Sequence, residues 1–297
     1  MTHHVTSGVV SGDTEPSIVR LRLPAKDGYT LTAYRFDPRM PIKAVIVIAS
    51  AMAVSQSFYV GFASFLAKQG FQVWTFDYRG IGESLQGSMR GVKTNLMEWV
   101  EKDFDSLICT AGDFNPHLPL YAIGHSFGGQ VAALLPSRKR LTGLISIASG
   151  SGSLRHNTPQ ARRKAPLLWY FLAPVLCTVF GYFPGARIGV IGNMPAGAVF
   201  QWRRWCLTPD YILSGQSGAR EAFASAQFSI LGLAFEDDEL LSEQGVRFMH
   251  DAYLQTTPDY RVIEAKKFGL KRIGHFGFFK PQGEAQLWPL VANWITR

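Results

Sequence analysis

Short apolar runs alternate with longer amphipathic stretches along most of this chain. The apolar runs, such as residues 44–49 (AVIVIA), are rich in β-branched residues, as expected of strands that are buried on both faces. The stretches between them, such as 57–69, carry apolar residues at helical spacing. This alternation predicts an α/β fold with a doubly wound, mostly parallel sheet. The other predicted strands are 71–76, 118–123, 144–148, 228–235 and 260–265, and the other predicted helices are 96–111, 128–135, 243–254 and 284–295.

Two regions depart from this alternation. Residues 18–23 and 29–36 are amphipathic runs separated by a turn, which predicts an antiparallel hairpin. After residue 149 the rhythm of strands and helices stops, and it resumes near residue 225. We therefore predict one core domain, formed by 1–149 and 225–297, and a helical cap inserted at 150–224.

Charge is distributed unevenly along the 297 residues. Hydrophobic residues make up 47% and charged residues 18% of the chain, which excludes a disordered or fibrous protein. The net charge is +8, yet residues 137–220 contain eleven basic residues and one acidic residue, so the remainder is slightly acidic. The surplus is therefore assigned to the predicted insertion, where it could attract anionic substrates or form a solvated surface. No recognition motif accompanies it, and we expect no nucleic-acid partner.

Residues 165–183 of the predicted cap form an uncharged apolar stretch of nearly membrane-spanning length, preceded by three basic residues. Pro166, Pro174 and the turn residues at 181–185 favour an apolar lid over a transmembrane helix, so we expect no integral membrane span. The N-terminal residues show no basic segment followed by an apolar run, and we expect no signal peptide and a cytoplasmic location. The sequence leaves open whether the chain is a monomer or a dimer.

Residues 124–128 (GHSFG) match the pattern G-x-S-x-G of a nucleophile elbow. They lie between a predicted strand and a predicted helix, where a tight turn requires small residues and holds the serine in a strained, exposed conformation. The N–H groups at the start of the following helix point toward any negative charge that develops there. Ser126 is therefore the candidate nucleophile.

Serine is a poor nucleophile at neutral pH and needs a base that is itself oriented by an acid. In this fold the acid and then the base are expected at the ends of later strands. His275 follows the strand predicted at 260–265 and is the candidate base. An acidic run follows the strand predicted at 228–235, and its spacing from that strand favours Asp238 over Asp237 as the acid.

An oxyanion hole needs two backbone N–H donors, one directly after the nucleophile and one after the strand at 44–49. The candidates are Phe127 for the first donor and Met52, or else Ala51, for the second. The candidate substrate-binding residues are Ala51, His125, Trp169, Trp202 and Trp205. The tryptophans of the cap fit an acyl or aromatic pocket and fit a small core of the cap equally well.

The sequence resembles the α/β-hydrolase superfamily. The resemblance covers nearly the whole chain outside the insertion and rests on GHSFGG at 124–129, DYRGIGES at 77–84, the Asp238 loop and Gly274-His275. Within the superfamily the chain is similar to capped serine hydrolases of the serine-aminopeptidase-like and lysophospholipase-like branches, and to predicted bacterial α/β hydrolases of unassigned substrate. The resemblance implies that Asp77 is structural. The common His-Gly dipeptide before the oxyanion loop is absent, with residues 49–51 (ASA) in its place.

The resemblance implies acyl transfer to Ser126 without a metal or an organic cofactor. The three cysteines are too few and too scattered for a disulfide framework or a zinc site. We expect a carboxylesterase for small or medium acyl esters, possible substrates being anionic or aromatic small molecules. Alternatives are another acyl-transfer enzyme (peptidase, lactonase, thioesterase, amidase or acyltransferase), a membrane-surface lipase, and a ligand receptor without catalysis.

Overall fold

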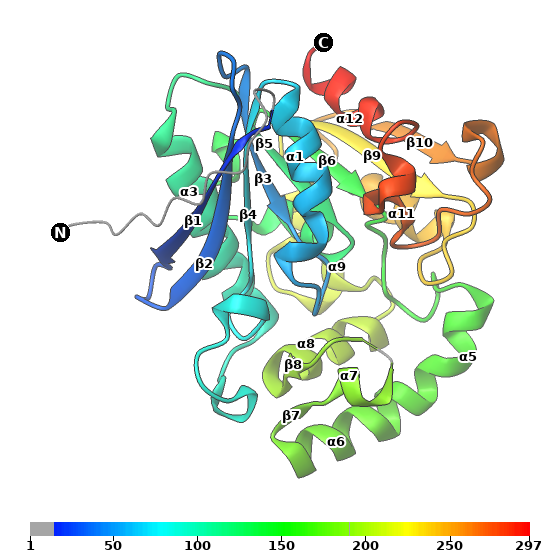
Figure 1. Cartoon of the computed structure of the whole chain (residues 1–297). Coiled ribbons are helices and arrows are strands. Elements are labelled where there is room, and N and C mark those ends of the chain that lie inside the picture. The colour runs from blue at the N-terminus through cyan, green and yellow to red at the C-terminus, as the bar shows by residue number, and fades with distance from the viewer. Residues whose placement is uncertain (1–14, 190) are drawn as a thin grey trace.

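The computed structural model of the chain describes residues 15–297 except Val190. At its centre lies an eight-stranded sheet with the strand order β1-β2-β4-β3-β5-β6-β9-β10 (Figure 1). β1 and β2 form the predicted antiparallel hairpin, β2 pairs antiparallel with β4, and all later pairs are parallel. The predicted mostly parallel sheet is thus confirmed. The strands are β1 (Ser17–Pro24), β2 (Thr30–Asp37), β3 (Ala44–Ala49), β4 (Phe71–Phe76), β5 (Leu120–His125), β6 (Gly143–Ile147), β9 (Ser229–Phe235) and β10 (Asp259–Ile263).

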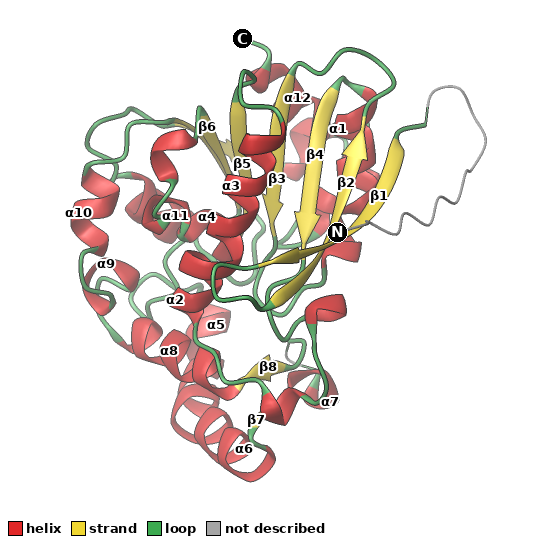
Figure 2. Cartoon of the chain, turned by 90° about the vertical axis from the view of Figure 1, so that its left-hand side faces the viewer, coloured by secondary structure: helices red, strands yellow, loops and turns green. Residues whose placement is uncertain are grey.

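Helices cover both faces of the sheet (Figure 2). One face packs against α1 (Val60–Lys68) and α12 (Trp288–Ile295) through a cluster that includes Phe62, Trp288 and the strand residue Ile46. The other face packs against α2 (Leu96–Glu98), the π-helical turn η4 (Trp99–Phe104), α3 (Asp105–Phe114), α4 (Phe127–Gln130) and α11 (Glu243–His250).

The last helix is shorter than its predicted range of 284–295. Pro289 lies in the first turn of α12, where it has no N–H to donate and its ring clashes with any helical turn before it. The helix therefore begins at Trp288, and the preceding residues form a separate turn, η10 (Pro281–Gly283).

The insertion between β6 and β9 contributes no described strand to the main sheet. In Figure 1 its larger helices lie beyond the carboxyl ends of the parallel strands. One hydrophobic cluster extends from the sheet residue Ala122 through Phe127 to Trp205 and Ile212, so the insertion shares its core with the sheet. The elements of the insertion are α5 (Pro159–Leu167), η7 (Leu168–Leu172), α6 (Ala173–Phe180), β7 (Tyr182–Phe183), α7 (Gly185–Ile188), β8 (Met194–Pro195), α8 (Ala196–Leu207), α9 (Ile212–Gly215) and α10 (Ala219–Ala224).

The uncharged stretch that begins at residue 165 lies mainly in α5, the π-helical turn η7 and α6, which follow one another without a break and which we call the cap helix (159–180). The π-helical turn precedes Pro174, which cannot donate a backbone hydrogen bond to the turn before it. The helix ends at Gly181, whose φ of 76° requires glycine. No helix in the described part of the chain combines the length and the apolar composition needed to cross a membrane.

The basic surplus is divided between two ends of the molecule, which corrects its assignment to the insertion. Residues 138–140 form η6 (Arg138–Arg140), which directly precedes β6 and therefore lies at the amino end of the parallel strands. Arg140 is paired there with Asp113 at 2.6 Å. Residues 150–224 keep eight basic and two acidic residues, so the insertion remains strongly basic.

Candidate active site

The elbow at the end of β5 is so tight that two of its positions require glycine. Ser126 lies between β5 and α4 with φ 51° and ψ −114°, a strained conformation for a residue with a side chain. A Cβ atom on Gly124 would overlap the backbone of Gly129, and one on Gly128 would overlap the carbonyl of Ala49. Both positions therefore need glycine, and the turn presents Ser126 at the carboxyl edge of the sheet.

His275 and Asp238 meet at this edge, each from the loop after a later strand. The Nδ1 atom of His275 lies 2.8 Å from Oδ2 of Asp238, and both residues are buried. The other carboxylate oxygen of Asp238 accepts hydrogen bonds from the N–H groups of Leu240 and Leu241, at 2.8 and 2.9 Å. Because a carboxylate only accepts, the neutral imidazole carries its proton on Nδ1, which leaves Nε2 able to take up a proton.

The neighbours of Asp238 in the acidic run contact the loop that carries His275. Asp237 accepts hydrogen bonds from the N–H groups of Ile273 and Gly274, both at 2.8 Å. Glu239 accepts one from the N–H of His275 at 3.2 Å. Asp237 and Glu239 thus position the backbone of this loop, whereas Asp238 contacts the imidazole. The sequence does not predict the contact of Glu239, because an acidic run is also typical of a solvated loop.

The two predicted oxyanion donors lie beside the elbow. The N–H of Ala51 donates to the hydroxyl of Tyr59 at 2.9 Å, which removes Ala51 from the candidate donors. In the described part of the chain, the N–H groups of Met52 and Phe127 have no hydrogen-bond partner. Phe127 is the first residue of α4, where a helix leaves its N–H groups free. Met52 and Phe127 are therefore the donors that remain available to an oxyanion.

A cavity of about 350 Å³ lies between this edge and the insertion. Ser126, His275, Ala51 and Met52 line it from the core. Two of the predicted cap tryptophans, Trp169 and Trp202, contribute to its lining from the cap. The remaining lining residues are Gln130, Gly152, Asn157, Ala161, Lys164, Ala165, Leu168, Gly189, Ile191, Cys206, Tyr211, Leu240, Leu241 and Phe276.

Trp205 does not line this cavity, so its prediction as a substrate-binding residue is wrong. Its side chain is fully buried and packs at a ring-centroid distance of 6.0 Å from Tyr211. Gly215 also lies against the indole and leaves no room for a Cβ atom there. Trp205 therefore belongs to the packed interior of the protein.

Part of the chain is similar in sequence to known hydrolases. A family model described as serine aminopeptidase, S33, matches residues 40–178. The monoacylglycerol lipase of Mycolicibacterium smegmatis is 36% identical over 95 residues, which cover 32% of this chain and only 31% of that lipase. The chain has the α/β-hydrolase fold.

Solved structures share this fold over nearly the whole length of the chain. A carboxyl esterase from Bacillus coagulans superimposes with a TM-score of 0.62 and 13% identity, covering 94% of this chain and 98% of the esterase. The monoacylglycerol lipase of Paleococcus ferrophilus superimposes with a TM-score of 0.59 and 14% identity, covering 89% of this chain and 98% of the lipase. At sequence identities this low, the similarity establishes the fold alone.

His125 does not line the cavity, so its prediction as a substrate-binding residue is also wrong. It is fully buried, and its Nε2 lies 3.0 Å from the carbonyl oxygen of His275. Its Nδ1 lies 2.8 Å from the hydroxyl of Tyr59. Burial, together with the nearby His275, holds the pKa of His125 well below its usual value, so the ring is neutral.

These contacts fix the protons in one chain of hydrogen bonds. The carbonyl of His275 can only accept, so Nε2 of His125 carries the proton and Nδ1 must accept one from Tyr59. The hydroxyl of Tyr59 in turn accepts the N–H of Ala51. This series of hydrogen bonds therefore connects the loop of the predicted oxyanion donor to the loop of the predicted base. No motif in the sequence identifies Tyr59, which lies at the end of the short helix η1 (Gln56–Tyr59).

Tyr211 is a second residue that the sequence does not reveal. Its φ of 54° is strained, and its hydroxyl donates to Oε1 of Gln130 at 2.9 Å. The amide of Gln130 donates to the carbonyl of Gly150 at 2.6 Å. Tyr211 therefore fastens the insertion to α4, the helix that follows Ser126.

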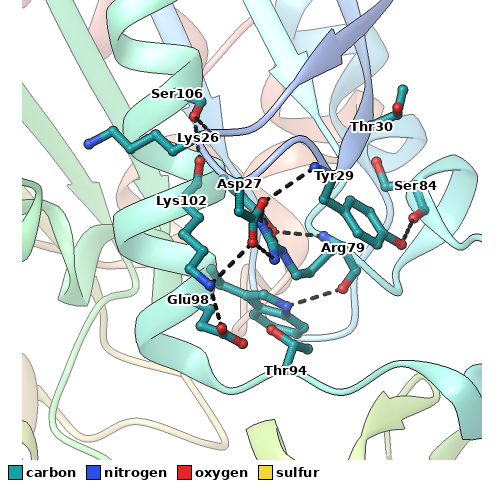
Figure 3. A network of polar contacts seen from close by, with 12 residues as sticks. Lys26, Asp27, Tyr29, Thr30, Arg79, Ser84, Thr94, Glu98, Lys102 and Ser106 are labelled. Carbon is teal, nitrogen blue, oxygen red and sulfur yellow. Dashed lines mark hydrogen bonds and ion pairs between the residues drawn. The ribbon is translucent and has the colours of Figure 1, made fainter.

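The loop after β4 supports the elbow from the side through ion pairs outside the cavity. Arg79 binds Asp27 with two hydrogen bonds of 2.7 and 3.0 Å (Figure 3). Arg79 also binds the buried Asp103. The guanidinium of Arg79 holds the pKa of Asp27 well below its usual range. The carbonyl of Arg79 accepts from the indole of Trp99, whose ring packs edge-on against Phe127 with centroids 5.9 Å apart.

Asp77, in the same loop, has the structural role that the resemblance implies. Its carboxylate accepts the backbone N–H groups of Gln56 and Glu83 at 2.7 and 2.8 Å. Across the described residues, no group of three or more His, Cys, Asp and Glu side chains could hold a metal ion. The prediction of a cofactor-free site remains a prediction.

Proposed function

We propose that this α/β hydrolase is a serine carboxylesterase that cleaves esters of small or medium acyl groups through an acyl-enzyme. One observation carries the proposal. Ser126, in its strained elbow, shares a mostly apolar cavity with His275, and a buried carboxylate of Asp238 is bound to the imidazole. A nucleophile, a base and an orienting acid in this order and arrangement are the groups that acyl transfer needs.

In the proposed reaction, Nε2 of His275 removes the hydroxyl proton of Ser126 while Oγ of Ser126 attacks the ester carbonyl. The oxyanion accepts the N–H groups of Phe127 and Met52, and Asp238 stabilises the imidazolium. The protonated His275 then gives its proton to the leaving alkoxide. Water repeats the cycle with His275 as base and releases the carboxylic acid.

The lining of the cavity favours esters over peptides. An aminopeptidase must bind the ammonium group of its substrate, which usually requires a carboxylate, and no Asp or Glu occurs among the described residues that line this cavity. The one lysine or arginine among the same lining residues is Lys164, which favours a neutral or anionic substrate. A volume near 350 Å³ is at the small end for ligand sites and suits a short or medium acyl chain. The names of the similar esterases and monoacylglycerol lipases agree with this choice.

Hydrolysis of p-nitrophenyl acetate, butyrate, octanoate and palmitate, with an amino-acid p-nitroanilide in parallel, tests the proposal. We expect turnover of the butyrate and octanoate esters, weaker turnover of the palmitate, and none of the anilide. Ser126→Ala should abolish turnover, whereas Ser149→Ala, a buried serine near the elbow, should retain most of it. Turnover of the anilide alone, or full activity of Ser126→Ala, would contradict the proposal.

A further inference from the structure

The cap helix exposes apolar side chains on its outer side. Leu167, Phe171, Val175 and Val179 recur at every fourth residue and are 60%, 58%, 43% and 64% exposed, and we call them the outer row. The neighbouring Tyr170 is 62% exposed. The opposite side of the same helix is buried through Ala165, Trp169, Ala173 and Cys177. A surface helix in water normally has polar residues on its outer side, so the outer row needs a partner that the described chain does not supply.

Basic side chains surround the outer row. Residues 155–207 contain seven basic and no acidic residues. Arg163 is exposed and lies four residues, about one helical turn, before Leu167, in line with the outer row. The guanidinium of Arg203 lies 5.6 Å from the ring centroid of Tyr170, and that of Arg187 lies 6.0 Å from the ring of Phe180. Cations therefore lie at both ends and along one side of the apolar surface.

The position of the cap helix leaves this side accessible. In Figures 1 and 2, α6 lies at the lower edge of the molecule, on the side of the insertion away from the main sheet. α8 contacts α6 from the inner side. The outer row is thus directed away from the rest of the protein.

We propose that the outer row docks on the surface of a bilayer that carries anionic lipid headgroups, with the cap helix lying in the plane of the interface. Apolar side chains on such a helix enter the boundary between headgroups and acyl chains, and flanking arginines bind the anionic headgroups. A second copy of the chain fits the surface less well, because it would bring two clusters of basic residues together. The proposal goes beyond the esterase activity and does not depend on it.

Co-sedimentation of the full chain with vesicles tests this docking. We expect binding to phosphatidylcholine vesicles that contain phosphatidylglycerol, weaker binding to pure phosphatidylcholine, and a decrease in both the bound fraction and its lipid preference at high salt. The double variant Phe171→Ser, Val175→Ser should lose most of the binding. Leu254→Ser, which removes a 71% exposed leucine of the core domain, should bind like the wild type.

A charge variant separates the electrostatic contribution. Arg163→Glu should weaken binding to the anionic vesicles by at least about fivefold, the factor that one basic residue contributes near such a surface. Arg22→Glu changes an exposed arginine on β1 by the same charge and should have a smaller effect. Unchanged thermal unfolding establishes that each variant is folded.

Three results would overturn the proposal. One is the absence of binding to phosphatidylglycerol vesicles at low salt. Another is wild-type binding by the folded double variant, which would place the contact elsewhere. The third is a dimer in analytical ultracentrifugation that the double variant abolishes, without vesicle binding by the wild type, since the partner would then be a second copy. Loss of esterase activity alone would not bear on the docking.

Discussion

The carboxyl edge of the sheet and the outer side of the cap helix differ in how fully their side chains are satisfied within the chain. At the sheet edge, Asp237, Asp238 and Glu239 each have a defined partner in the loops around His275. On the cap helix, the apolar side chains of the outer row are 43–64% exposed. The difference indicates that the geometry of the edge is set by internal contacts, whereas the outer side of the cap is suited to something outside the protein.

The largest expected effect distinguishes two neighbouring carboxylates of the sheet edge. Asp238→Asn should lower kcat for a p-nitrophenyl ester by about 10³- to 10⁴-fold, because the amide no longer fixes the tautomer of His275 or stabilises the imidazolium. Asp237→Asn should lower kcat by less than about tenfold, since its remaining oxygen still accepts one loop N–H. Steady-state kinetics of the two variants measure the contrast. Equal losses of kcat, or a larger loss in Asp237→Asn, would show that Asp238 is not the acid of the triad.

A second contrast lies within α8 of the insertion. Trp205→Ala should lower the free energy of unfolding by about 3–5 kcal/mol, because it leaves a cavity in the shared core. Trp202→Ala should cost less stability and instead raise KM for the longer esters, since Trp202 lines the cavity. Urea unfolding and ester kinetics measure the two quantities. The assignment of the two tryptophans fails if their effects on stability and KM are exchanged.

A third contrast concerns two buried tyrosine hydroxyls near the elbow. Tyr59→Phe removes the hydroxyl that connects Ala51 to His125 by hydrogen bonds. This variant should lower kcat by about five- to thirtyfold, the equivalent of about 1–2 kcal/mol, with little change in KM. Tyr78→Phe removes a hydroxyl that has no hydrogen-bond partner within the described chain, and kcat should change less than about twofold. If both variants keep wild-type kcat, the chain of hydrogen bonds does not position the reacting groups.

The smallest expected effect is a pH dependence of stability. The unfolded chain binds a proton at His125 below a pH of about 6.5, whereas burial keeps this residue neutral in the folded protein. Its contribution to stability is therefore present above about pH 6.5 and decreases, by at most about 1.4 kcal/mol per pH unit, as the pH falls toward its lower folded-state pKa.

His125→Gln removes this titration and should flatten the pH dependence of stability. Urea unfolding of the wild type and His125→Gln at several pH values between 7 and 5 measures the difference. His156 and His250, whose pKa values are also lowered by burial, contribute equally to both proteins. Identical slopes would show that His125 is not held neutral.

The sequence predicts the strands well and is sufficient to propose a candidate triad, because both depend on local patterns. Buried runs such as 44–49 and the elbow at 124–128 are visible in a few adjacent residues, and Asp238 and His275 follow from their places after strands. Tyr59 and Tyr211 escape prediction, because their partners lie 66 and 81 residues away and only the folded chain brings them together. Similarly, a tryptophan-rich helix does not reveal which indole faces the cavity, hence the error at Trp205.

Mass spectrometry of the fluorophosphonate-treated protein tests the central claim, the nucleophilic role of Ser126, most directly. We predict one adduct per chain, located on the peptide that contains Ser126, with ester hydrolysis lost in proportion to labelling. Ser126→Ala should take up no label, and Ser149→Ala should be labelled like the wild type. An adduct on another residue, or undiminished ester hydrolysis by a fully labelled protein, would contradict the account.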